Sequence, residues 1–448
     1  MESKITKAQA YAQAQAYAQA QAYAQAQAYA QAQAYAQAQA YAQAQAYAWV
    51  IFGSGAASIG PSFSSKLGAL SHNTKSTADR ILDFGYHSET HKVTTTDGYG
   101  LTLFRIRPAR IRDVRNPNGP VVLMMHGLMS SSDGWVINGP SQALAFLLAE
   151  AGYDIWLGNA RGNPYSQQHR KWSNATQRFW HFSIHEIGIY DLPAIMDYIL
   201  HVTQQTSLHY VGHSQGCMIL LILLSSHKEY NDKIRTAHLL APVAFMKHAN
   251  QFLLRLIALL FARPSPLNAL VGDRPLLQSQ LIMDFLGGNR CRPITSYPVE
   301  CSNVLFLVSG GWSGYFNKTL LPSIFATHPA SCSTNQYIHL AQLHVTAGFH
   351  AFDFGREGNL LQYSRPEPPA YDLSNINTLL PIHIYYSDYD EFASKRDVEH
   401  LIQVMGKRAI SHFIDLPQFT HTDFIWAINV KETINRPILD IMNQAEGT

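Results

Sequence analysis

A serine enclosed by two glycines lies between a short run typical of a strand and an apolar run typical of a buried helix. The strand-like run is Leu208–Val211, the motif Gly212–Gly216 reads Gly-His-Ser-Gln-Gly, and the helix-like run is Gln215–Leu224. This pattern in this context predicts a sharp strand-to-helix turn that strains the backbone and exposes the hydroxyl of Ser214. Glycines are needed because the strand and the helix approach closely there. Ser214 is therefore a candidate nucleophile, with an ordinary turn as the alternative.

The chain around this motif alternates between strand-like runs and helical patterns. The alternation predicts an α/β fold with a mostly parallel sheet and helices on both faces. It breaks at about residue 245 and resumes after about residue 370, so we expect one core interrupted by an insertion. The predicted strands are Val121–Met125, Tyr153–Leu157, Leu208–Val211, Ala237–Ala241, Ile382–Tyr386 and Ile410–Ile414, and the predicted helices are Ser141–Ala151, Ile187–Ile199, Gln215–Leu224 and Asp397–Met405.

A nucleophilic serine needs a base, and the base needs a carboxylate that orients it. In folds with this serine turn the chain order is serine, acid, histidine. His421 follows the last predicted strand, and we take it as the base. Asp390 follows the strand Ile382–Tyr386 and is favoured as the acid over Asp388 and Asp397.

The tetrahedral intermediate of acyl transfer needs backbone N–H donors for its oxyanion. One donor is expected from Gln215, the residue after the nucleophile, at the N-terminus of the predicted helix. The second is expected from Leu128, in the turn His126–Leu128 that follows the strand Val121–Met125. The alternative for that turn is an ordinary strand end.

Longer motifs make the sequence similar to one known family. They are Thr94–Tyr99, His126–Leu128, Ala151–Asn163, Phe179–Ser183, Gly212–Gly216, Leu240–Val243 and His421–Trp426. With these motifs the segment from about Ile81 to the C-terminus resembles the acid lipase family, which comprises the gastric and lysosomal acid lipases and their invertebrate relatives. The resemblance implies an α/β-hydrolase fold. It also implies a triad of Ser214, Asp390 and His421, with Leu128 and Gln215 forming the oxyanion hole.

The resemblance also implies a domain organisation. Residues 245–370 would form a cap with a lid over an acyl-binding pocket, inserted between two core parts, residues 61–244 and 371–448. Within the cap, the apolar run Phe252–Phe261 is expected to be a helix. Two interpretations are equally compatible with the sequence: a core helix of the cap, or a lid that contacts a lipid interface.

The same resemblance implies a disulfide in the cap between Cys291 and Cys301. Cys217 and Cys332 would then be free, and Cys217 in the buried helix is expected to be a small core residue. His181 and His185 are four residues apart, but the order is not His-Glu-x-x-His and no third ligand is evident. We therefore expect no metal and no cofactor.

The amino-terminal part of the chain differs from the rest. From Ala8 to Ala48 the sequence repeats Ala-Tyr-Ala-Gln-Ala-Gln, and such low-complexity tracts are typical of disorder. We expect residues 1–60 to be a catalytically silent extension, with a fibrous or adhesive role as the alternative. The run is not apolar enough for a signal peptide, so none is evident at the N-terminus as given.

Composition and sequons limit the setting in which the protein works. The 448 residues carry a formal net charge of +2, which gives no reason to expect nucleic acid as a partner. No apolar run approaches the roughly 18 residues that a membrane-spanning helix needs. Glycosylation sequons begin at Asn174 and Asn317. Together with the implied disulfide they favour an oxidising compartment, so we expect a secreted or lysosomal protein. The oligomeric state is not predicted.

These features together predict a serine hydrolase that cleaves carboxylic esters of long acyl chains through an acyl-enzyme. A triacylglycerol or a sterol ester would be the substrate, and the cap could contact the lipid interface. One alternative is an esterase for short, soluble esters. A second alternative is a lipid-binding relative without catalytic activity.

Overall fold

The computed structural model describes residues 75–108, 119–265, 268, 271–276 and 313–447. All of them belong to the unit Pro61–Thr448. The predictions for residues 1–60, and the predicted disulfide between Cys291 and Cys301, lie outside the described residues.

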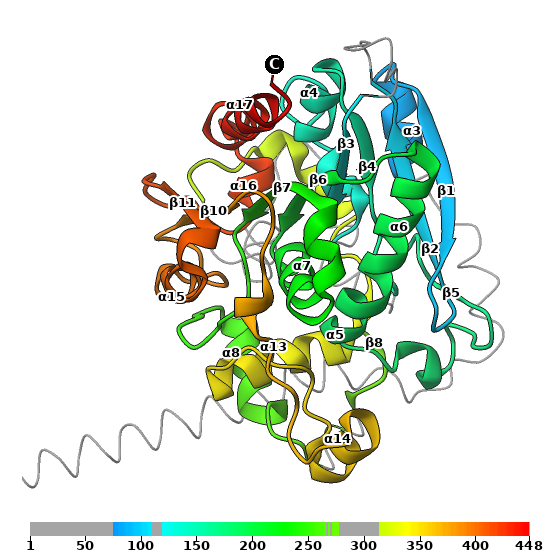
Figure 1. Ribbon diagram of the computed structural model, residues 1–448, viewed down its shortest axis with the longest axis vertical. Coiled ribbons are helices and arrows are strands. Elements are labelled where there is room, and N and C mark those ends of the chain that lie inside the picture. Colours follow the sequence, from blue (N-terminus) through cyan, green and yellow to red (C-terminus); the bar gives the residue numbers. More distant parts are fainter. Residues whose placement is uncertain (1–74, 109–118, 266–267, 269–270, 277–312, 448) are drawn as a thin grey trace, which may run out of the picture. The chain divides into compact units, whose positions relative to one another are not determined.

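A mixed sheet forms the centre of the described core (Figure 1). Its strands follow the order β1-β2-β4-β3-β6-β7-β10-β11, and the short β5 pairs with β2. Neighbouring strands from β4 to β11 are parallel, whereas β1 pairs with β2, and β2 with β4, in antiparallel orientation. The predicted α/β class is therefore confirmed. The strands are β1 (Ser88–Thr94), β2 (Tyr99–Ile106), β3 (Val121–Met125), β4 (Asp154–Leu157), β5 (Gln168–His169), β6 (Leu208–His213), β7 (Ile234–Leu240), β10 (Ile382–Ser387) and β11 (Ala409–Ile414).

Helices cover both faces of this sheet. Because β4 and β6 flank β3 on opposite sides, the β3–β4 and β6–β7 connections run in opposite directions along the sheet. Right-handed crossovers then place α4 (Leu144–Glu150) on one face and α7 (Gln215–Ser226) on the other. Figure 1 shows α6 (Leu192–Thr203) beside α7. The other described helices of the core are α3 (Thr77–Asp83), α5 (Ile184–Glu186), α15 (Lys395–Met405), α16 (Asp423–Trp426) and α17 (Arg436–Ala445).

The central strands could be predicted from the sequence because they are buried. Every residue of β3, β4, β6 and β10 is buried, as expected for parallel strands that are covered on both faces. In α7, all residues from Gln215 to Ser225 are buried, so the prediction of a helix surrounded by core is confirmed.

Two predicted helices differ from the structure by more than two residues at one end. Residues 139–142 form turns with a left-handed Gly139, so α4 begins at Leu144 rather than Ser141. The predicted helix Ile187–Ile199 is a π-helical turn, Ile187–Asp191, followed by α6. Pro193 stands in the first turn of α6, and because proline has no N–H it favours an irregular helical turn before it.

The described part of the predicted cap is mostly helical. Its elements are α8 (Phe252–Phe261), α12 (Leu321–Phe325), α13 (Thr334–Thr346), α14 (Gly355–Tyr363) and the strand pair β8 (Pro275–Leu276) and β9 (Cys332–Ser333). Figure 1 shows α8, α13 and α14 grouped together beyond one end of α7. Helix α8 contacts α13 and buries Leu254 and Ile257, whereas Phe252 and Leu259 are 54% and 62% exposed.

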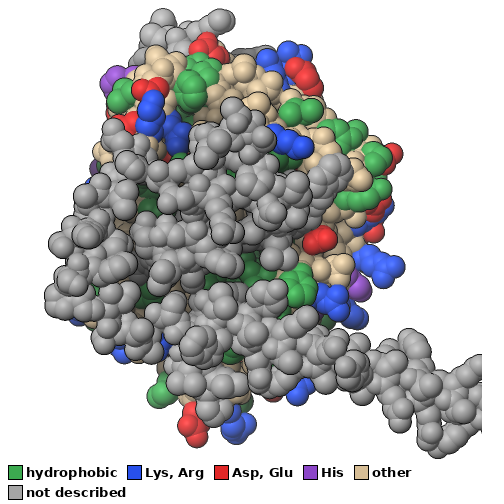
Figure 2. All heavy atoms as spheres, turned by 180° about the vertical axis from the view of Figure 1, so that it is seen from behind, with side chains coloured by type: hydrophobic (Ala, Val, Ile, Leu, Met, Phe, Trp, Pro, Cys, Tyr) green, Lys and Arg blue, Asp and Glu red, His purple; other side chains and the backbone are tan. Residues whose placement is uncertain are grey.

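The surface is chemically mixed. On the face in Figure 2, the described Lys and Arg side chains lie among Asp and Glu side chains, in keeping with the near balance of charge. Within the described ranges, no helix is both long enough and apolar enough to cross a bilayer.

Candidate active site

Ser214 lies at the sharp turn that joins β6 to α7. Its backbone has φ 54° and ψ −114°, a conformation that costs on the order of 1–3 kcal/mol for a residue with a side chain. The N–H of Ser214 donates to the carbonyl oxygen of Leu240 at 2.9 Å. This bond ties the turn to the end of the neighbouring strand β7.

The two glycines of the motif are required by close backbone contacts. A side chain at Gly216 would place its Cβ 2.3 Å from the carbonyl oxygen of Met125, at the end of β3. One at Gly212 would place its Cβ 2.7 Å from the carbonyl carbon of Gly216 itself. Strand β6, helix α7 and strand β3 therefore converge where only glycine fits, as the sequence predicts.

The structure brings the three predicted triad residues together. The Ser214 Oγ and the His421 Nε2 are 2.7 Å apart, and the His421 Nδ1 is 2.7 Å from the Asp390 Oδ2. Because a carboxylate only accepts, the Nδ1–H of His421 donates to Asp390, which leaves Nε2 free to accept the hydroxyl proton. All three residues are at most 8% exposed.

The carboxylate that faces His421 is held by its own loop. The Asp390 Oδ1 accepts hydrogen bonds from the N–H groups of Phe392 and Ala393, both at 2.8 Å. The competing carboxylates have other partners. Asp388 pairs with Lys395 at the surface, and Asp397 accepts from the backbone and ring of His248. The geometry thus favours Asp390 over both.

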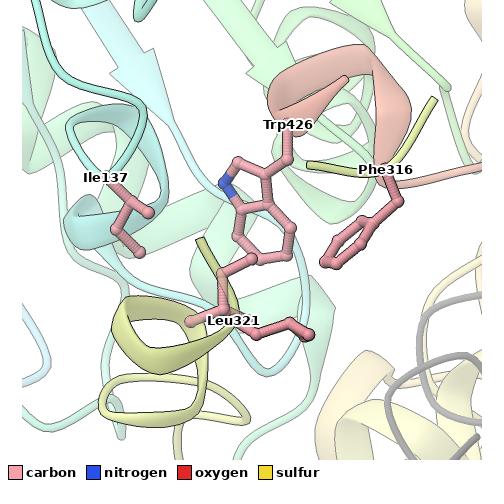
Figure 3. Close-up of a cluster of buried hydrophobic side chains, with 5 residues drawn as sticks. Ile137, Phe316, Leu321 and Trp426 are labelled. Carbon is pink, nitrogen blue, oxygen red and sulfur yellow. The ribbon is translucent and has the colours of Figure 1, made fainter. Parts of the chain in front are cut away.

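An apolar cluster supports the segment that carries His421. Trp426, on α16, is 4% exposed, and its indole N–H donates to the Gly134 carbonyl oxygen at 3.1 Å. Figure 3 shows the indole between Ile137 and Phe316, with Leu321 beneath it. The cluster joins the loop after β3, helix α12 and helix α16, so it fixes the His421 segment against the core.

The turn that carries Leu128 lies against the nucleophile. A Cβ at Gly127 would be 3.1 Å from the Cβ of Ser214. In the same turn, the Nδ1–H of His126 donates to the Gly127 carbonyl oxygen at 2.8 Å. The His126 Nε2 accepts from the N–H of Ala160 at 3.2 Å. This neutral ring therefore braces the turn from which Leu128 would donate to an oxyanion.

Comparison with known proteins shows the family of this chain. A family model described as "alpha/beta hydrolase fold" matches residues 120–427, and one described as "Partial alpha/beta-hydrolase lipase region" matches residues 77–139. Lipase 3 of Drosophila melanogaster is 38% identical over 82% of this chain and 93% of that protein. Gastric triacylglycerol lipase of Bos taurus is 36% identical over 84% of this chain and 94% of that protein. The chain belongs to the acid lipase family of α/β-hydrolases. The chain is therefore a carboxylic ester hydrolase of the lipase type.

Solved structures add little to this assignment. A putative aryl esterase from Burkholderia cenocepacia aligns with a TM-score of 0.46 and 16% identity, over 80% of this chain and 100% of that chain.

Other residues considered in the sequence have structural partners in this acid lipase. His181 pairs with Asp273 at 2.9 Å, whereas His185 bonds the Tyr371 hydroxyl at 2.7 Å, so the two rings do not share a site. Within the described ranges, no group of three His, Cys, Asp or Glu side chains is placed to hold a metal. Cys217 and Cys332 are buried and free, as predicted.

The sequence patterns predicted no role for a buried arginine near the site, although this arginine lies in the family motif Ala151–Asn163. Arg161 is 2% exposed, and its guanidinium contacts Asp97 and Asp191, each at 2.6 Å. It also lies 3.9 Å from the centre of the Tyr99 ring. The residue before it, Ala160, is the one that donates to His126, so Arg161 anchors the loop behind the oxyanion turn.

Replacing Arg161 by methionine is expected to lower the free energy of unfolding by about 3–5 kcal/mol, because Asp191 is left buried without its cation. Chemical denaturation would measure the loss. The matched control is Arg436→Met, which removes an exposed pair with Glu432 and should cost less than about 1 kcal/mol. Equal losses in both variants would contradict the assigned role of Arg161.

Two neutral histidines beside the site predict acid sensitivity. Burial lowers the pKa of His126 to about 4 and, with the nearby His421, that of His213 to about 3. As pH falls below the ordinary value near 6.5, the unfolded chain takes up these protons before the folded chain does. Stability should therefore fall between about pH 6.5 and pH 4, by about 1.4 kcal/mol per histidine for each pH unit.

Urea denaturation at half-unit pH steps tests this expectation. Other buried histidines, among them His238, His328 and His339, lower stability in the same direction, so the fall should be shallower in His126→Gln and in His213→Gln than in wild type. An equal fall in wild type and both variants would show that His126 and His213 do not stay neutral in the folded protein.

Proposed function

We propose that this protein hydrolyses carboxylic esters of long acyl chains through an acyl-enzyme on Ser214. The hydrogen-bonded line from Ser214 through His421 to Asp390 is the observation that carries the proposal. This line supports the assignment of Ser214 as nucleophile, His421 as base and Asp390 as orienting carboxylate, the order that ester hydrolysis requires.

In the first half of the reaction, the Ser214 Oγ bonds to the ester carbonyl carbon as its proton passes to the His421 Nε2. The carbonyl electron pair moves to the oxygen, where the N–H groups of Leu128 and Gln215 would stabilise the charge. The carbonyl then re-forms, the ester bond breaks, and His421 gives its proton to the leaving alcohol. Water deacylates Ser214 by the same steps, and Asp390 stabilises the cationic His421 in both halves.

The proposed substrate is a triacylglycerol or a sterol ester. Relatives named gastric triacylglycerol lipase support the first, and the exposed Phe252 and Leu259 on α8 suit contact with a lipid interface. We take residues 245–370 as a cap over the acyl site, between core parts 61–244 and 371–448. Residues 1–60 would be an extension without a catalytic role.

The substrate class is tested with two esters on the same preparation. An emulsified long-chain triacylglycerol should be hydrolysed faster than a soluble short-chain ester at the same concentration of ester bonds. The reverse order would favour the short-chain esterase. Failure of wild-type protein to form a covalent adduct on Ser214 with a phosphonate probe would favour a lipid-binding relative without activity.

We also propose that the protein is secreted or lysosomal, and the two sequons offer a test. The Asn174 side-chain N–H donates to Gln167 at 2.9 Å. By contrast, the Asn317 Oδ1 accepts from the hydroxyl and N–H of Thr319, with no bond from its amide nitrogen to another described residue.

Glycosylation is therefore expected at Asn317 rather than at Asn174, because a glycan on Asn174 would sacrifice the bond to Gln167. After expression in a secretory system, Asn317→Gln should lose one glycan by mass spectrometry, and Asn174→Gln should lose none. Occupancy confined to Asn174 would contradict the expectation, and no glycan on secreted wild-type protein would count against both sites.

A further inference from the structure

The first turn of α13 is joined to the core next to the nucleophile. Ser333 caps this helix: its N–H donates to the Gln336 Oε1 at 2.9 Å, and its hydroxyl donates to the Trp180 carbonyl oxygen at 2.7 Å. Ser333 and Gln336 are at most 2% exposed. The end of the helix is therefore fixed both within itself and to the core.

Gln336 makes a second contact, with the residue that follows the nucleophile. Its Nε2 donates to the side-chain Oε1 of Gln215 at 2.8 Å. The direction of this bond is fixed, because the N–H of Ser333 can only donate and so must face the Gln336 oxygen. The amide nitrogen of Gln336 is thereby turned toward Gln215, which is 2% exposed.

We propose that Gln336 is a positioning residue, which holds Gln215 so that the backbone N–H of Gln215 points at the developing oxyanion. The inference rests on the proposed function, because it concerns the oxyanion hole of that reaction. Gln215 is the first residue of α7 and follows the strained backbone of Ser214. A small displacement there would move the donor away from the position in which the charge develops.

The contact has a structural consequence. α13 lies in the region proposed as the cap, whereas Gln215 belongs to the core, so the bond links the placement of α13 to the geometry of the oxyanion hole. A role limited to helix capping would predict a loss of stability alone. A positioning role predicts a lower rate of the chemical step with substrate binding unchanged.

The variants Gln336→Met and Ser333→Ala separate the two roles. Ser333→Ala removes the hydroxyl that accepts from the Asn335 N–H and donates to Trp180. Gln336→Met removes the acceptor of the Ser333 N–H, and it alone removes the donor to Gln215. We expect Gln336→Met to lower kcat about 10-fold with KM unchanged, and to weaken a boronic acid inhibitor, which forms a tetrahedral adduct with serine, by the same factor. Ser333→Ala should lower the melting temperature by a similar amount and keep the wild-type kcat and inhibitor affinity.

A double-mutant cycle then asks whether Gln336 acts through Gln215. Gln215→Ala keeps the backbone N–H and loses the side-chain acceptor, so adding Gln336→Met to it should lower kcat no further. Three results would overturn this inference and leave the proposed function standing. They are a wild-type kcat in Gln336→Met, an equal fall of kcat in Ser333→Ala, and multiplicative effects on kcat in the double variant. A wild-type protein that hydrolyses no ester would instead refute the proposed function, and the inference with it.

Discussion

Replacing Ser214 by alanine is expected to lower kcat for ester hydrolysis by about 10⁵- to 10⁶-fold. The variant retains the oxyanion donors and the substrate site, but it has no hydroxyl for His421 to activate at 2.7 Å. Alanine adopts the left-handed backbone at this position no worse than serine does, and the N–H bond to Leu240 remains. The loss of activity should therefore occur without loss of stability.

Initial rates on the preferred ester, together with thermal melts, measure both quantities. Ser225→Ala is the matched control, because Ser225 is a buried serine in α7, the helix that follows Ser214, and its hydroxyl donates to the Ile222 carbonyl oxygen. It should keep wild-type activity. If purified Ser214→Ala retained full esterase activity, the nucleophile would have to be another residue.

The second large effect is expected from Asp390→Asn, which should lower kcat about 10⁴-fold. The Asp390 Oδ1 accepts from the N–H groups of Phe392 and Ala393. In the variant the amide oxygen must stay toward these two donors, so its NH₂ group faces the His421 Nδ1. His421 then carries its proton on Nε2 and cannot accept the proton of Ser214.

Activity as a function of pH, with a melt of each variant, tests this explanation. Asp388→Asn is the control two residues away, because Asp388 is exposed and pairs with Lys395; its activity should match that of wild type. An Asp390→Asn enzyme within tenfold of wild type would show that another carboxylate orients His421.

Much of the core and the candidate triad could be predicted because their signals are local. The motif Gly212–Gly216 indicates a tight turn by itself, because the backbone contacts at Gly212 and Gly216 leave no room for a side chain. The buried strand β3 is a continuous apolar run, and β6 and β10 are rich in aliphatic and aromatic residues, as expected for parallel strands that are covered on both faces. Asp390 and His421 follow strand ends, where chain order sufficed to select them.

Three features were not predicted, although two of them have a local cause. In the antiparallel pair of β1 and β2, β1 has a mixed pattern of exposure whereas β2 is almost entirely buried. The Asp97-Gly98 turn between them was the signal available for this pair. The π-helical turn before α6 follows from one proline inside a helical pattern. The bond from Gln336 to Gln215 joins residues 121 positions apart, and neither residue carries a local signal for it.

The direct pairing of β7 with β10 has a consequence for how the enzyme becomes active during folding. His238 on β7 and Tyr385 on β10 are hydrogen-bonded although 147 residues separate them. Closing so long a loop costs conformational entropy before the contact repays it. Ser214 comes before the β7–β10 pairing in the chain, whereas Asp390 and His421 come after β10. A chain in which only the first half has folded therefore has the nucleophile but not the base. Recovery of hydrolysis during refolding would thus report the joining of the two halves of the sheet, not the formation of either one.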